Sequence, residues 1–143
     1  MKLKGKFKED WLPIKDYESY YLISNIGNIK SIDRAVNHYK GGVRNAKGKT
    51  LKPYKNKTGY FYVDIQIKGI RKKFTIHRLV AEHFVSGYKD GLEVNHKDCD
   101  KTNNHYTNLE WVTRAVNTQH AYDNGLIDTS NRGGYRHGKR KVL

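Results

Sequence analysis

The most regular alternation of apolar and polar residues runs over residues 60–67, where it predicts a β-strand with one buried side. The apolar positions are Phe61, Val63, Ile65 and Ile67. A two-residue turn at Lys68-Gly69 leads back into a second strand over residues 70–77. That turn pairs polar residues as Gln66 with Arg71, Asp64 with Lys73 and Tyr62 with Thr75. It pairs apolar residues as Ile67 with Ile70, Val63 with Phe74 and Phe61 with Ile76. Only Lys72, opposite Ile65, breaks the agreement between the strands, so the pattern predicts a β-hairpin.

Apolar residues in the following stretch, residues 77–85, have helical spacing. We expect a short helix with Leu79, Val80 and Phe84 facing inward. His77 and His83 flank this apolar side, where a histidine usually packs or forms a hydrogen bond rather than reacting.

A second compact unit is predicted after this helix. A short apolar strand ends at His96, a polar loop follows, and another strand covers residues 109–112. Thr113 is suited to cap a helix that carries Asn117. Such a strand–loop–strand–helix unit can bring His96 and Asn117 to one point, which could hold a metal ion and a phosphate.

The N-terminal part is also apolar enough to fold. Large apolar residues recur through residues 11–32, and Asn-Ile-Gly-Asn at 25–28 supplies a tight turn between two β-branched segments. A small β-layer with an aromatic core is therefore predicted. Residues 36–58, by contrast, are poor in apolar residues and rich in Gly, Lys and Asn. We expect them to form a long mobile loop that orders on contact with phosphate.

The charge balance indicates which class of partner the protein binds. The 143 residues include 28 Lys and Arg against 14 Asp and Glu, a net charge of +14. Such a balance favours a polyanion, most simply nucleic acid, over a merely solubilising surface with mixed signs. The polar face of the hairpin is typical of a two-stranded ribbon on DNA, although it could also simply face solvent. The candidate DNA contacts are Lys47, Lys49, Lys52, Lys55, Lys57, Tyr60, Tyr62, Gln66, Arg71, Lys73 and Arg114.

Composition also excludes several classes of protein. No stretch approaches the roughly 20 apolar residues of a membrane helix. The lysines at positions 2, 4, 6 and 8 flank no apolar run, so no secretory signal is expected. Cys99 stands alone, which excludes a disulfide framework and every multi-cysteine zinc site. An intracellular, reduced protein of the cytoplasm is therefore expected.

The polar loop resembles the start of a calcium-binding loop, but that interpretation fails. Asp98, Asp100 and Thr102 have the right spacing. Asn103 stands where a glycine is required, and Leu109 where a bidentate glutamate is required. A buried structural histidine would account for His96 alone, but not for the asparagines around it.

Those asparagines carry a resemblance to a known family. Asn95-His96, Asn108 and Asn117 stand in a spacing that resembles the HNH nuclease motif, in its variant with asparagine in the third position. The similarity to phage and intron-encoded HNH homing endonucleases extends over three further segments, HRLVAEHFV, VNHKDCDKTNN and NLEWVT. Residues 11–32 resemble the nuclease-associated modular DNA-binding motif that precedes the HNH unit in many of them. The resemblance implies an α+β fold, with a small N-terminal antiparallel β-region followed by a ββα-metal nuclease unit.

The same resemblance implies roles for individual side chains. His96 matches the general base that takes a proton from the attacking water. Asn108 matches the residue that ties the ββα loop to itself and orients the histidine. Asn95 and Asn117 match the positions that hold one divalent ion, Mg²⁺ or Mn²⁺, although relatives often have Asp or His at one of them. His120, on the same helix as Asn117, is placed to contact the scissile phosphate.

The implied function is a metal-dependent, homing-type endonuclease that nicks one strand of double-stranded DNA. It would act as a monomer, unless two chains dimerise on a palindromic site. We expect a DNA-binding β-region over residues 1–76, the nuclease unit over 77–127 and a basic tail over 128–143. A non-enzymatic DNA-binding protein on a degenerate HNH scaffold is the alternative, because neither proposed ligand is charged. An RNA-binding module is less favoured, because the usual stacking-platform signatures are absent.

Overall fold

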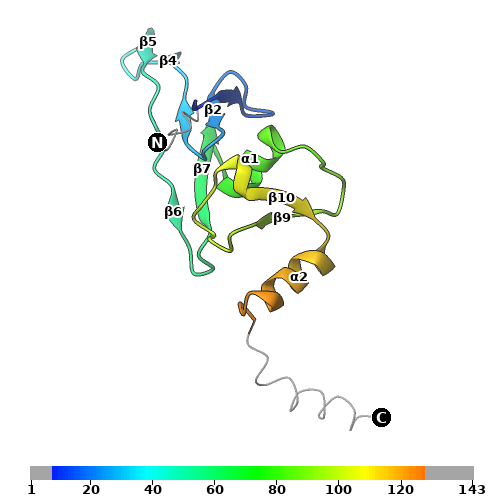
Figure 1. The fold of residues 1–143 in the computed structure, drawn as a ribbon. Coiled ribbons are helices and arrows are strands. Elements are labelled where there is room, and N and C mark those ends of the chain that lie inside the picture. Colours follow the sequence, from blue (N-terminus) through cyan, green and yellow to red (C-terminus); the bar gives the residue numbers. More distant parts are fainter. Residues whose placement is uncertain (1–7, 128–143) are drawn as a thin grey trace, which may run out of the picture.

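The computed structural model describes residues 8–127 and has the α+β architecture that the sequence predicts (Figure 1). Its strands are β1 (Trp11–Pro13), β2 (Tyr21–Ser24), β3 (Ile29–Ser31), β4 (Arg34–Asn37), β5 (Val43–Ala46), β6 (Tyr54–Lys55), β7 (Phe61–Ile67), β8 (Ile70–Thr75), β9 (Glu93–His96) and β10 (Leu109–Val112). Its helices are α1 (Ile76–Phe84), the short 3-10 helix η1 (Tyr106–Asn108) and α2 (Arg114–Asp123). The basic tail predicted over residues 128–143 lies outside the described residues.

The N-terminal β-layer is confirmed as an antiparallel sheet of β1, β2 and β3. Its predicted turn is tied by the Ser24 hydroxyl, which accepts hydrogen bonds from the backbone N–H groups of Ile26 and Asn28. Gly27 in this turn has a φ of +93°, and an added Cβ would lie 3.1 Å from the Cβ of Asn104. Glycine is required there both for the backbone conformation and for the close approach of the later loop.

The hairpin of β7 and β8 is confirmed with the predicted register, from Tyr62 opposite Thr75 to Ile67 opposite Ile70. One predicted pair is wrong. Ile76 does not pair with Phe61, because it begins α1 one residue earlier than expected and is buried in the core. Phe61 instead pairs with Lys55 of β6, on the other edge of β7.

The expectation of a long loop over residues 36–58 is wrong. β4 and β5 form an antiparallel hairpin, reversed at Gly41 and Gly42, which both have positive φ. Farther along, the backbone around Thr50 bonds to β3 and forms a bridge opposite Lys30. Composition misled here because an exposed ribbon is held by backbone hydrogen bonds and buries no apolar face. Its residues therefore lack the periodicity that identifies a half-buried strand.

One hydrophobic core joins the N-terminal β-layer to the later elements. It contains Ile14, Tyr21, Ile23, Ile29, Val63, Ile65, Ile76, Leu79, Val80, Ala81, Val94 and Leu109. The predicted inward positions of α1 are confirmed, with Leu79 and Val80 buried and Phe84 packed against the same core. The described residues of the two predicted regions, 1–76 and 77–127, therefore share one packed interior.

The strand–loop–strand–helix unit is confirmed. β9 and β10 pair antiparallel with His96 opposite Leu109, and the Thr113 hydroxyl accepts a hydrogen bond from the Val116 N–H at the start of α2. In Figure 1 α2 lies at the opposite end of the molecule from the β4–β5 hairpin. No helix within residues 8–127 has the length and apolar character needed to cross a membrane.

Candidate active site

Three residues of the predicted motif, Asn95, His96 and Asn117, line a pocket of about 300 Å³ between β9, the loop after it and α2, and Asn108 is not part of its lining. Its polar lining includes Asn95, His96, Cys99, Lys101, Asn117, Thr118 and His120. Tyr60, just before β7, adds an aromatic ring from the N-terminal half of the chain. The pocket thus combines side chains from both predicted regions.

His96 is held in one orientation by a partner that the motif did not identify. The imidazole is 5% exposed, and its Nε2 lies 3.0 Å from Oδ1 of Asn104, which is itself buried. An amide oxygen can only accept a hydrogen bond, so Nε2 carries the proton and Nδ1 is left with its lone pair. Within residues 8–127, Nδ1 of His96 has no hydrogen-bond partner. Asn104 was missed because nothing in its spacing separates it from the other asparagines of the loop.

Two further rings pack on this histidine. The ring centroid of His77 lies 5.1 Å from that of His96 and 4.8 Å from that of Tyr60. Burial, followed by the charges of His96 and Arg78, lowers the pKa of His77 from 6.5 to about 4. His77 is therefore neutral at physiological pH and packs against the site, as its place beside an apolar helix indicated.

Asn95 and Asn117 each direct the amide nitrogen to a carboxylate. Nδ2 of Asn95 donates to Glu110 and Nδ2 of Asn117 donates to Glu93, both at 2.9 Å. These bonds fix the amide rotamers, so the Oδ1 atoms remain as possible ligand atoms for a cation in the pocket. The hydrogen bond from Asn117, followed by that from Arg114, holds the pKa of Glu93 below its usual value.

This arrangement fits a divalent cation better than the sequence alone indicated. Amide oxygens are suitable ligands for Mg²⁺ and Mn²⁺, and the two carboxylates behind them add negative charge close to the site. Within residues 8–127, no three His, Cys, Asp or Glu side chains form a conventional metal cluster. Glu93 and Glu110 were missed because their role depends on strand pairing, which places Glu110 directly opposite Asn95.

Asn108 ties the polar loop together. Its Nδ2 donates to Asp98 Oδ1 and to the carbonyl of Asn103, both at 2.9 Å, and its Oδ1 accepts from the Asp98 N–H. The side-chain hydrogen bond from Asn103, ahead of those from the Asp100 N–H and Asn108, lowers the pKa of Asp98. Asp98 and Asp100 are thus engaged inside the loop, and the contact to His96 comes from Asn104 instead.

His120 reaches the loop from α2. Its Nε2 lies 3.3 Å from the carbonyl oxygen of Lys97, and its ring nitrogens lie 3.9 and 4.0 Å from the sulfur of Cys99. Cys99 has a φ of +64°, a conformation that L-residues other than Asn and Asp rarely adopt. His120 lines the same pocket as His96.

The predicted DNA contacts lie in several different settings. The five lysines from Lys47 to Lys57 are exposed along β5, β6 and their connections, and Gln66, Arg71 and Lys73 are exposed on the hairpin. Tyr62 stacks on Tyr54 at a centroid distance of 6.1 Å, with the Lys73 ammonium over both rings. Tyr60 lies in the pocket instead, and Arg114 pairs with Glu93 at 2.9 Å.

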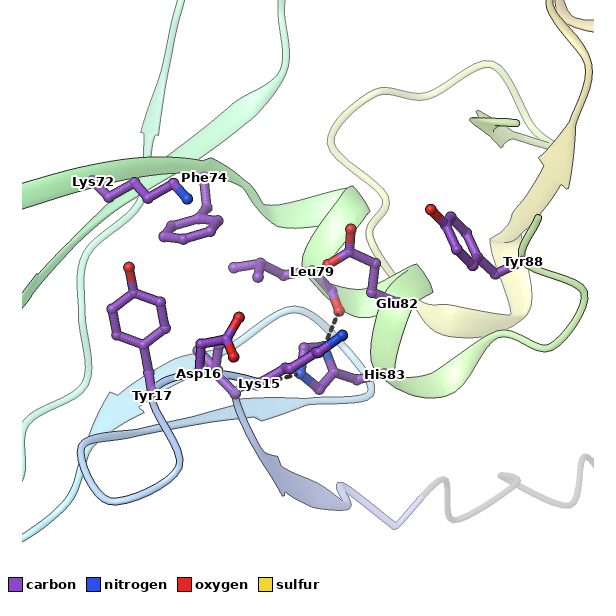
Figure 2. Close-up of a pocket in the computed structure, with 10 residues that line it drawn as sticks. Lys15, Asp16, Tyr17, Lys72, Phe74, Leu79, Glu82, His83 and Tyr88 are labelled. Atoms are coloured by element: carbon purple, nitrogen blue, oxygen red, sulfur yellow. Dashed lines mark hydrogen bonds between the residues drawn. The ribbon is translucent and has the colours of Figure 1, made fainter. Parts of the chain in front are cut away.

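A larger cavity, of about 630 Å³, lies elsewhere and contains none of the motif residues. Figure 2 shows Lys15, Tyr17, Phe74 and His83 around it. His83 Nδ1 lies 2.7 Å from the Leu79 carbonyl, and Nε2 accepts from the Lys15 N–H at 3.0 Å. Both ring nitrogens are therefore hydrogen-bonded, Nδ1 within α1 and Nε2 to the N-terminal layer, in agreement with the predicted hydrogen-bonding role.

Both halves of the chain match known protein families. Residues 9–66 match the NUMOD4 motif, and residues 74–119 match the HNH endonuclease family. The DNA endonuclease I-HmuI of Bacillus phage SP01 is 40% identical over 121 residues, which are 85% of this chain and 62% of that protein. An uncharacterized HNH endonuclease, L247 of Acanthamoeba polyphaga mimivirus, is 37% identical over 133 residues, which are 90% of this chain and 30% of that protein. The chain thus spans less than two thirds of the length of these curated relatives.

A solved structure gives the most extensive agreement. It describes DNA binding and cleavage by the HNH homing endonuclease I-HmuI, and it matches with a TM-score of 0.74 at 38% sequence identity. The match covers 92% of this chain and 68% of that one. The similarity therefore extends through the N-terminal β-layer as well as the pocket, and the chain belongs to the HNH homing endonuclease family.

Proposed function

We propose that this chain is a metal-dependent endonuclease that hydrolyses one phosphodiester bond in double-stranded DNA. The observation that carries the proposal is the state of His96. A buried imidazole whose Nε2–H is bound to Asn104 presents a free Nδ1 to a pocket that also contains the amide oxygens of Asn95 and Asn117. A base of this kind beside a cation site is suited to activating water against a phosphate ester.

In the proposed reaction, Nδ1 of His96 takes a proton from water as the oxygen attacks phosphorus. Asn104 holds the imidazole in the tautomer that has this nitrogen free, and it stabilises the imidazolium that forms. Asn95 and Asn117 would bind the divalent ion through Oδ1. A bound ion supplies charge stabilisation for the phosphate and for the departing 3′-oxygen. His120, at the wall of the pocket, would contact the phosphate.

A basic path would bring DNA to this pocket. The lysines at positions 47, 49, 52, 55 and 57 follow the extended segment that runs along one side of the molecule from β5 past β6 (Figure 1). That segment ends in the turn of Asn56 and Gly59, next to the pocket residue Tyr60. Phosphate contacts along the segment would orient the duplex without reading its sequence.

Incubation with supercoiled plasmid, with and without Mg²⁺ or Mn²⁺, tests the proposal. One base and one cation site should cut one strand per encounter, so nicked circles should accumulate before linear plasmid. Linear product without a nicked intermediate would point to two chains acting on a palindromic site. DNA binding without cleavage under either metal would instead support the non-enzymatic alternative.

A further inference from the structure

Lys101 is the only lysine or arginine among the described residues that line the pocket. Its Nζ donates a 2.8 Å hydrogen bond to the carbonyl of Thr58 and lies 4.7 Å from the ring centroid of Tyr60. The side chain is exposed, and within residues 8–127 it forms no ion pair. Lys101 was not among the predicted DNA contacts, whereas Arg114, which was, is paired with Glu93.

The contacts of Lys101 orient its charge and leave most of its hydrogen-bonding capacity free. An ammonium has three N–H donors, and the Thr58 carbonyl uses one of them. The face of Tyr60 attracts the cation without using a donor. Two N–H groups thus remain for anionic oxygens, at the edge of the pocket that contains His96.

The turn that contacts Lys101 is itself tightly built. Asn56 Oδ1 accepts from both the N–H and the hydroxyl of Thr58, and Gly59 follows with a φ of +87°. A Cβ added at Gly59 would touch Cδ of Lys101 at 3.4 Å. The turn therefore fits around the lysine, although 43 positions separate Lys101 from Thr58.

From these contacts we propose that Lys101 binds a non-bridging oxygen of the scissile phosphate and stabilises the charge that grows there during cleavage. The inference rests on the proposed nuclease function. In the step, water forms a new bond to phosphorus and its proton passes to Nδ1 of His96. The bond from phosphorus to the 3′-oxygen breaks, and the 3′-oxygen leaves with the electron pair and takes a proton from solvent. Lys101 keeps its proton throughout and acts through its charge and its two free donors.

Three variants separate this role from the structural bond to Thr58. Lys101→Gln keeps an N–H donor for the carbonyl but removes the charge, whereas Lys101→Arg keeps the charge. Lys97→Gln is the matched control, because Lys97 is exposed on the same loop and does not line the pocket. It removes the same net charge from the surface that meets DNA.

The measurement is the single-turnover cleavage rate of a duplex at saturating enzyme with Mg²⁺, together with urea unfolding of each variant. We expect Lys101→Gln to be about 10²-fold slower than the unsubstituted chain, which is the usual loss for one transition-state donor. Lys97→Gln should stay within about threefold, since it loses only a general attraction to phosphate. Lys101→Arg should keep most of the rate. Equal rates for Lys101→Gln and Lys97→Gln would overturn the assignment of Lys101.

A binding experiment covers the case in which Lys101→Gln unfolds more easily. Once the nick is mapped, the duplex can carry a neutral methylphosphonate at that phosphate. It should bind the unsubstituted chain more weakly than normal DNA, and the difference should persist for Lys101→Arg, which keeps the charge that senses the phosphate. An unsubstituted chain that binds both duplexes equally would overturn the assignment. An unsubstituted chain that cuts no DNA would overturn the proposed function itself.

Discussion

Two polar stretches of this chain have very different structures. Residues 36–58 and residues 97–108 are both rich in Lys, Asn, Gly or Thr and poor in apolar residues. The first forms an exposed hairpin and an extended segment held by backbone bonds. The second contains two buried amides, Asn104 and Asn108, and a dense set of side-chain hydrogen bonds.

The difference follows from which polar side chains can satisfy one another. The short amide of the buried Asn108 reaches Asp98 and Asn103 in the same loop, so its burial leaves no unpaired group. A lysine ammonium is costly to bury and stays in water, which keeps the first stretch at the surface. A polar segment can therefore be a rigid part of an active site when its residues are Asn and Asp rather than Lys.

The largest expected contrast is between His96, which immediately precedes the second stretch, and a histidine of the first. His96→Ala should lower the cleavage rate by about 10²–10⁴-fold, the usual contribution of a general base, while leaving DNA affinity nearly unchanged. His38→Ala, in the exposed hairpin, should cleave at the unsubstituted rate. Plasmid nicking and a filter-binding assay measure the two quantities. Normal cleavage by His96→Ala would remove His96 from the mechanism.

Asparagines in the two stretches should differ in stability. Asn108→Ala removes three hydrogen bonds from the loop and leaves Asp98 and the Asn103 carbonyl without them, so it should cost about 4 kcal/mol of unfolding free energy. Asn45→Ala, on the exposed strand β5, should change it by less than about 0.5 kcal/mol. Urea unfolding provides the comparison. Similar midpoints for the two variants would show that the loop is not held by its amides.

The buried side of the molecule should also respond to pH through His77. The pKa of His77 is about 4 in the folded chain, whereas an unperturbed histidine, as in the unfolded chain, has a pKa of 6.5. The unfolded chain therefore binds a proton at this residue first as the pH falls. Stability from this group is full above about pH 6.5 and declines toward pH 4, by at most about 3 kcal/mol. His77→Phe keeps a ring in the stack and should flatten this part of the stability profile. His38→Phe, in the β4–β5 hairpin, serves as the control, and an unchanged profile in His77→Phe would contradict the assignment.

Cation affinity should change with a substitution at Asn95, in the strand that leads into the polar loop, and should not change with one on the exposed strand β5. In Asn95→Asp a carboxylate replaces the amide that donates to Glu110, and the two like charges favour a cation between them. We expect Mn²⁺ to bind the free protein about tenfold more tightly, as measured by calorimetry. Asn45→Asp adds the same charge to β5 and should leave the affinity unchanged. Tight binding by the unsubstituted free chain would mean that other residues hold the ion.

The smallest expected effect belongs to the exposed lysines. Each of Lys52→Gln, Lys55→Gln and Lys57→Gln should reduce the slope of log affinity against log salt by about 0.9 for every phosphate that the lysine neutralises. The preferred cutting site should not move, since phosphate contacts position the duplex and do not read bases. Lys89→Gln, an exposed lysine in the loop between α1 and β9, is the control. Fluorescence anisotropy at several salt concentrations gives the slopes, and slopes equal to that of the control would place the DNA elsewhere.

Much of the fold could be predicted from the sequence because the deciding contacts are local. The register of β7 and β8 follows from alternation around a two-residue turn, and Thr113 is recognisable as a cap from its position before α2. The motif also indicated which side chains would share a pocket, since a strand, a loop and a helix in that order bring His96 near Asn117. In each case the partners lie close enough along the chain for spacing to carry the information.

Other features were decided only by tertiary packing. Tyr60 and His77 stack beside His96, Gly27 makes room for Asn104, and Lys101 bonds to the Thr58 carbonyl. The same holds for the hairpin of β4 and β5, whose exposed faces have no apolar periodicity to reveal it. By itself, the sequence determined the local elements and the chemistry of the motif, because these depend on neighbours a few positions away. Only the tertiary structure decided which distant side chains complete the pocket, because close packing depends on the shape of the whole core and not on spacing along the chain.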